Sequence, residues 1–179
     1  MKKIWMFAAI LFILYGCTEK KEEPTVESES AMVEVKIPTE VAQHYGSLNI
    51  EHKVSDIFKT IQPNGVVSLE MNQQQLTEIA QQTEQFLEQY KETSEKSPEN
   101  GIMHIDADED YSNWEIVLSD DLLLGQEAFD LAQEYLIKNI LTYQLVHRNI
   151  PELNIRYITD SGEPLDRKNI RTKFTYSDE

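Results

Sequence analysis

The sequence predicts an α+β fold whose core runs from residue 66 to residue 159. Three observations predict it: two long segments with apolar residues at helical spacing, four short segments in which apolar and polar residues alternate, and short connections between them. Along the chain these segments follow the order strand, helix, strand, strand, helix, strand. The length of 179 residues suits one domain with flanking tails, and 40% hydrophobic residues are enough to form a core.

The first half of the core begins with a strand over residues 66–71, in which apolar and polar side chains alternate after a Pro-Asn-Gly turn. Asn72 and Gln75 have the spacing of a capping box, which predicts a helix that begins directly after the strand. Apolar residues then recur on one side, and we expect the helix to end near Glu95. Its other side is rich in glutamine and is either a solvated face or a partner surface.

The second half contains strands at 102–107 and 114–119, joined by an acidic turn, then a helix ending near Arg148 and a strand at 153–157. The complete order, βαββαβ, is that of the ferredoxin-like (split βαβ) fold. Two right-handed crossovers would place both long helices on one face of a single antiparallel sheet. The other face would then be open to solvent.

We expect this open face to be the contact surface for a partner, because charged and polar side chains alternate outward along its strands. The candidate interaction residues are Ser68, Glu70, His104, Glu115, Asn154 and Arg156.

Shorter additions flank the core. Residues 31–65 are expected to supply an edge strand at 33–37 and two short helices, at 39–45 and 55–61, that pack on the core. Residues 160–179 begin with a turn and continue as an edge strand or a tail. This tail is locally basic, and we expect it to dock against carboxylates of its own domain.

The N-terminus has the features of an export signal. Lysines at positions 2 and 3 precede twelve apolar or aromatic residues, and a helix of that length reaches only about 18 Å, short of the ~30 Å hydrocarbon core. The next residues, Leu14-Tyr15-Gly16-Cys17, resemble the lipobox of bacterial lipoproteins. The resemblance implies that residues 1–16 are a signal peptide and that Cys17 carries diacylglycerol and an N-acyl chain. The alternatives are a plain secretory signal with an incidental cysteine, or an uncleaved signal anchor.

Residues 17–30 are charged and nearly devoid of apolar side chains, so we expect the lipidated cysteine to be followed by a disordered acidic tether. The expected location is therefore the extracytoplasmic face of the cell membrane. The net charge of −16 argues against a nucleic-acid partner, because neutralising phosphates requires clustered basic residues. A single cysteine excludes a disulfide framework and a cysteine-rich zinc site.

One segment has the spacing of a calcium loop. Asp106, Asp108 and Asp110 form a D-x-D-x-D pattern, but Tyr111 and Val117 occupy the positions where an EF-hand has glycine and bidentate glutamate. The segment is therefore either a low-affinity calcium site or a solvated acidic turn.

The sequence contains no nucleophile elbow, no phosphate-binding glycine loop and no paired histidines at metal-ligand spacing. We therefore expect a non-catalytic binding module, without a cofactor beyond the covalent lipid. Its expected partners are the lipid bilayer, through Cys17, and a protein of the cell envelope. The alternatives are an envelope enzyme or enzyme inhibitor without a readable motif, or a calcium-binding surface protein.

Overall fold

The computed structural model of the chain describes residues 31–48, 50–96, 101–119, 126–165 and 169–175. The expected signal peptide, lipobox and tether lie outside these residues. The elements are β1 (Met32–Ile37), α1 (Thr39–Tyr45), the 3₁₀ helix η1 (Ile50–His52), β2 (Phe58–Ile61), β3 (Val67–Asn72), α2 (Gln73–Lys96), β4 (Ile102–Ala107), β5 (Asn113–Leu118), α3 (Gln126–Val146), β6 (Glu152–Thr159) and β7 (Ile170–Lys173).

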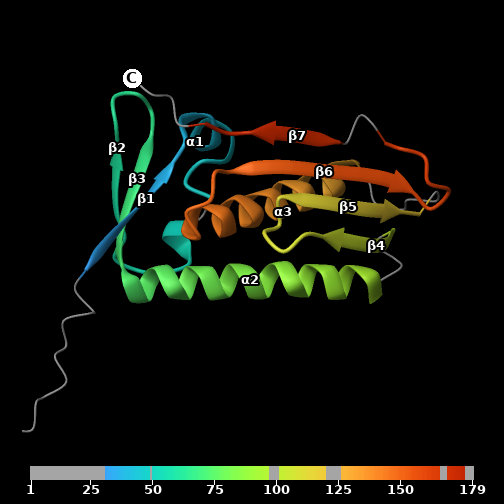
Figure 1. Cartoon of the computed structure of the whole chain (residues 1–179), viewed down its shortest axis with the longest axis horizontal. Helices are drawn as coiled ribbons and strands as arrows, with labels where there is room; N and C mark the ends of the chain where they lie inside the picture. The colour runs from blue at the N-terminus through green and yellow to red at the C-terminus, as the bar shows by residue number, and fades with distance from the viewer. Residues whose placement is uncertain (1–30, 49, 97–100, 120–125, 166–168, 176–179) are drawn as a thin grey trace, which may run out of the picture.

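The strands form two sheets, so the predicted α+β class is confirmed. A three-stranded antiparallel sheet has the order β1-β3-β2, and a four-stranded sheet has the order β4-β5-β6-β7. Within the larger sheet, β5 and β6 are parallel and the other neighbours are antiparallel. The two sheets occupy opposite ends of the molecule, and α2 extends along both (Figure 1).

The ferredoxin-like strand order expected from the sequence is not the one observed. That order would place residues 66–71 at the centre of the large sheet, but β3 pairs with β1 on one edge and β2 on the other. The strand β5 instead pairs directly with β6, with Ile116 opposite Tyr157. Only residues 62–66 separate β2 from β3, and such local antiparallel pairing needs little loop-closure entropy.

The source of this difference is the segment expected as a helix at 55–61. Residues 58–61 form β2, which joins β3 through a tight turn closed by a hydrogen bond from the Gln62 amide to the Val66 carbonyl, at 2.8 Å. Gly65 adopts φ 86° in this turn, and a Cβ there would lie 2.8 Å from Thr39 Cγ2. The hairpin therefore occupies the edge of β3 that the predicted sheet needed. In the expected flank, the strand at 33–37 and the helix at 39–45 are present as β1 and α1.

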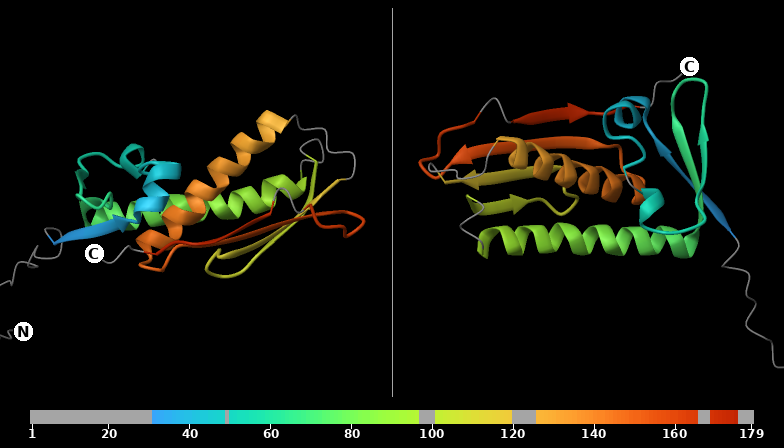
Figure 2. Two further views of the ribbon diagram at one scale, coloured as in Figure 1. Left: turned by 90° about the horizontal axis from the view of Figure 1, so that it is seen from above. Right: turned by 180° about the vertical axis from the view of Figure 1, so that it is seen from behind.

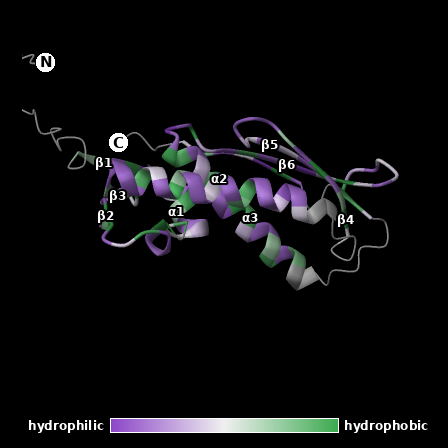
Figure 3. Ribbon diagram, turned by 90° about the horizontal axis from the view of Figure 1, so that it is seen from below, coloured by the Kyte–Doolittle hydropathy of each residue, from purple (hydrophilic) through white to green (hydrophobic). Residues whose placement is uncertain are grey.

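The two long helices lie on one face of the four-stranded sheet (Figure 2), although the single antiparallel sheet expected beneath them is not present. The capping box at the start of α2 is formed: the Gln75 amide donates to Asn72 Oδ1 at 2.8 Å, and the Asn72 amide donates to Gln75 Oε1 at 2.7 Å. Helix α2 is buried along one stripe only. Helix α3 has more buried side chains, because it packs against α2, β6 and β1. Figure 3 accordingly shows more hydrophilic colour along α2 than along α3.

Strand β7 confirms the edge strand expected in the C-terminal segment. It pairs antiparallel with β6, and Lys173 Nζ lies 3.3 Å from Glu152 Oε2, so this basic segment docks on a carboxylate of its own domain. Buried apolar residues from both sheets and the helices form one continuous core. Within the described residues, no helix has both the length and the apolar character needed to span a bilayer.

Candidate functional site

The four-stranded sheet has an open face, defined by the side chains that point away from α2 and α3. On β5, Trp114, Ile116 and Leu118 are buried against the helices, so the alternate residues point to solvent. Cross-strand register extends this face over the neighbouring strands. The open face consists of His104, Asp106, Asn113, Glu115, Val117, Glu152, Asn154, Arg156, Ile158, Arg171 and Lys173.

Side chains on the open face form rows that cross the strands. In one row Asp106 lies opposite Glu115, and Glu115 lies opposite Arg156, whose Nη1 donates to Glu115 Oε2 at 3.2 Å. In the next row Asn154 Nδ2 donates to Asn113 Oδ1 at 2.7 Å. Over β4 and β5 the charged carboxylates are Asp106 and Glu115, whereas β6 and β7 carry three cations and one carboxylate, namely Arg156, Arg171, Lys173 and Glu152.

The Glu115–Arg156 ion pair is held weakly. The Arg156 side chain is 57% exposed and the Glu115 side chain is 44% exposed, and such pairs contribute about 0–1 kcal/mol to stability. A partner can therefore replace this internal pairing at low cost. Next to the pair lies an open hollow of about 470 Å³, whose lining includes Asp106, Asn113 and Asn154.

The structure brings together four of the six predicted interaction residues, namely His104, Glu115, Asn154 and Arg156. The predicted placement on the open face was wrong for the other two. Ser68 is buried in the three-stranded sheet and accepts a hydrogen bond from Gln62 Nε2 at 2.9 Å. Glu70 is exposed on that same sheet. Both residues belong to β3, so they share the physical reason given above for the strand order.

Sequence reasoning missed the two basic residues that β7 adds to the open face. Arg171 lies opposite Asn154 and Lys173 lies opposite Glu152, both on β7. The signal that points to them is the alternation after residue 170, because it places every second side chain of an edge strand on the same face.

Two of the three aspartates in the candidate calcium segment stabilise the β4–β5 turn. The Asp108 carboxylate accepts hydrogen bonds from Ser112 Oγ at 2.9 Å and from the Asn113 amide at 3.1 Å, and Asp110 Oδ1 accepts one from the Ser112 amide at 3.1 Å. Desolvation alone would raise the pKa of Asp108, but these neighbouring hydrogen-bond donors together bring it below its ordinary value. No group of three or more His, Cys, Asp or Glu side chains in the described ranges could hold a metal ion.

An aromatic cluster fixes the same turn from its buried side. Tyr111 adopts a left-handed φ of 57° and is 5% exposed. Its ring packs edge-on against Tyr143, with centroids 4.7 Å apart, its carbonyl accepts from Trp114 Nε1 at 2.9 Å, and its hydroxyl donates to Glu88. Burial, with a further contribution from Glu88, raises the pKa of Tyr111. The turn therefore has a buried tyrosine where an EF-hand loop has glycine.

The other strongly shifted groups among the described residues are buried tyrosines. Burial raises the pKa of Tyr90 to about 12 and also raises that of Tyr157. The Tyr90 ring lies 6.5 Å from the Trp114 ring, and Tyr157 packs against Phe129. These shifts arise from packing between the sheet and the helices, away from the open face.

Comparison with known proteins adds no relative. The chain matches no known protein family, no curated protein and no solved structure.

Proposed function

We propose that the protein is a lipid-anchored, extracytoplasmic and non-catalytic binding module that docks a protein of the cell envelope through the open face. The observation that carries this proposal is the arrangement of that face: a sheet surface that α2 and α3 leave uncovered, with an acidic half over β4 and β5 and a half over β6 and β7 in which cations outnumber the one carboxylate, Glu152. The lipobox resemblance around Cys17 supports the anchor and the location.

The charge pattern defines the partner. A complementary surface carries basic groups opposite β4 and β5 and acidic groups opposite β6 and β7, because matched potentials orient an encounter and reject other partners. The internal ion pairs are exposed, so exchanging them for intermolecular pairs costs little.

The position of β1 is compatible with an anchored module. Strand β1 begins at one end of the molecule, and the four-stranded sheet occupies the other end (Figure 1). The expected tether of about thirteen residues reaches roughly 45 Å when extended, which separates the domain from the headgroups. Anionic lipids would repel so acidic a chain, so attachment depends on the acyl chains.

The docking proposal is tested with a charge swap that keeps the internal pair. In the double variant Glu115→Arg with Arg156→Glu, the ion pair re-forms in reverse, so we expect the melting temperature to stay unchanged. Crosslinking in intact cells followed by purification should recover the partner with the wild type and lose it with the swap.

A matched swap on the other sheet is the control. Glu34 and Lys36 form an exposed pair at 3.6 Å on β1, outside the open face. The variant Glu34→Lys with Lys36→Glu should recover the partner as the wild type does. Equal recovery by the Glu115/Arg156 swap would contradict the docking proposal.

The anchor is tested separately by metabolic labelling with a radioactive fatty acid. The wild type should incorporate label and Cys17→Ser should not. Label that remains on the Cys17→Ser protein would show that the lipid is attached elsewhere.

A further inference from the structure

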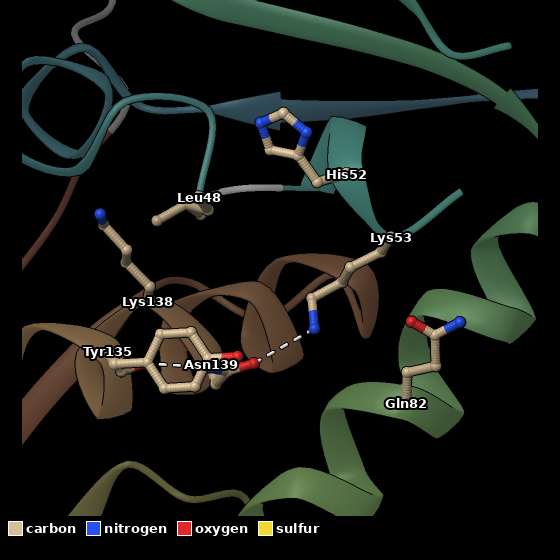
Figure 4. Close-up of a pocket in the computed structure, with 7 residues that line it drawn as sticks. All are labelled: Leu48, His52, Lys53, Gln82, Tyr135, Lys138 and Asn139. Carbon is tan, nitrogen blue, oxygen red and sulfur yellow. Dashed lines mark hydrogen bonds between the residues drawn. The ribbon is translucent and has the colours of Figure 1, made fainter. Parts of the chain in front are cut away.

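A second hollow, of about 430 Å³, is lined by no residue of the open face. Figure 4 shows the residues of its walls. The hollow forms where the segment after α1 crosses over α2 and α3. Its walls include Leu48, Lys53, Gln82, Tyr135, Lys138 and Asn139. The volume lies within the range of small-molecule sites, roughly 300–1,000 Å³.

Lys53 is the unusual residue of this hollow. Its ammonium group is half-buried and donates to Asn139 Oδ1 at 3.2 Å, and burial lowers its pKa. The carboxylate of Glu51, two residues away, instead accepts from Ser47 Oγ at 2.8 Å and pairs with Lys59 at 3.0 Å. Among the described residues no carboxylate forms an ion pair with Lys53, although the chain contains 32 acidic residues. Burying part of an ammonium group carries a desolvation cost, which a bound anion would offset.

The surroundings of Lys53 are ordered in advance. Asn139 is 3% exposed, and its Nδ2 donates to the Tyr135 carbonyl at 2.9 Å, which turns its Oδ1 toward Lys53. An ammonium group has three donors, so two remain for a ligand. The other lysine of the hollow, Lys138, is neutralised by Glu134 at 2.6 Å, so Lys53 supplies the positive charge.

Apolar surface lies beside this charge. The Tyr135 side chain is 53% exposed, and its ring lies in front of Asn139 in Figure 4. Leu48 is buried and holds a left-handed φ of 58°, a strained conformation that is more common at functional positions than elsewhere.

We propose that this hollow binds a small carboxylate with an apolar body, whose carboxylate accepts from Lys53 and whose body packs against Tyr135. This site is independent of the docking function proposed for the open face. The bound carboxylate would provide the anion that Lys53 lacks among the described residues.

The test uses the full-length protein in a non-ionic detergent, with benzoate, acetate and benzylammonium as probes. In ¹⁵N-resolved NMR spectra, benzoate should shift the Lys53 and Asn139 signals saturably, acetate more weakly, and benzylammonium not at all. Lys53→Gln keeps a donor but removes the charge, and should raise the Kd for benzoate at least about tenfold. Lys53→Arg should retain binding, and the exposed control Lys36→Gln should not change it.

A second variant separates binding from folding. Tyr135→Ala removes a half-exposed ring that also packs edge-on against Phe86. The melting temperature should therefore fall slightly, with the protein still folded, while affinity for benzoate falls and that for acetate does not. The proposal is overturned if benzoate leaves the Lys53 and Asn139 signals unchanged, or if Lys53→Gln or Tyr135→Ala binds benzoate as the wild type does.

Discussion

Tyr111 offers a sharp test of how the acidic turn is held, because two opposing effects meet at this residue. Its ring is buried against Tyr143 and Trp114, which stabilises the fold. Its backbone has a left-handed φ of 57°, a conformation that residues other than glycine rarely adopt. Replacing it with alanine removes only the first effect, whereas replacing it with glycine also removes the strain.

The expected magnitudes follow from these two effects. Truncating a buried aromatic side chain to alanine costs about 3–5 kcal/mol. Glycine escapes a left-handed strain of about 1–2 kcal/mol but adds about 0.5–1 kcal/mol of chain entropy to the unfolded state. Tyr111→Gly should therefore be at least as stable as Tyr111→Ala, by roughly 0–1.5 kcal/mol, the reverse of the usual order of these residues.

Equilibrium urea unfolding, followed by circular dichroism at 222 nm, measures both variants against the wild type. An alanine variant that is more stable than the glycine variant would refute the left-handed turn. A loss below 1 kcal/mol for Tyr111→Ala would refute the role of the buried ring.

Three further predictions concern the start of α2 and the aspartates of the acidic turn. Asn72→Ala removes the acceptor of the Gln75 amide in the capping box and should cost about 1 kcal/mol in urea unfolding; no loss would show that the cap is unimportant. Asp108 has a lowered pKa in the folded state, so its contribution is present above its ordinary value of 3.8 and is lost as pH falls through the folded-state pKa. The stability difference between wild type and Asp108→Asn should therefore be larger at pH 6 than at pH 3, and a constant difference would contradict this. In calorimetric titration with calcium, we expect the same trace for the wild type and for a variant with Asn at positions 106, 108 and 110, because turn donors already occupy Asp108 and Asp110; heat seen only with the wild type would establish the calcium site.

Local patterns in the sequence predicted the elements that depend on neighbouring residues. The capping box fixes the start of α2, and the alternation of Trp114, Ile116 and Leu118 fixes the buried side of β5. The same alternation predicted the outward direction of Glu115, which lies on the open face.

Strand partners could not be predicted in this way, because they depend on competition between distant segments. Phe58 and Ile61 are three residues apart, which resembles helical spacing, yet they lie on the edge strand that pairs with β3. Recognising that hairpin would have removed β3, and with it Ser68 and Glu70, from the predicted open face.

The second hollow shows the same limit. Lys53 and Asn139 are 86 positions apart in the chain, and neither belongs to a motif. Only the packing of the segment after α1 over α3 brings them together.

The most direct test of the docking proposal is site-specific photo-crosslinking in living cells. A photoreactive amino acid at Asn154 lies on the open face, whereas the same group at Gln85 lies on the exposed side of α2, the alternative partner surface. We predict that Asn154 yields a discrete crosslinked envelope protein and that Gln85 yields none. A crosslink from Gln85 with none from Asn154 would place the partner on the helices and contradict the account.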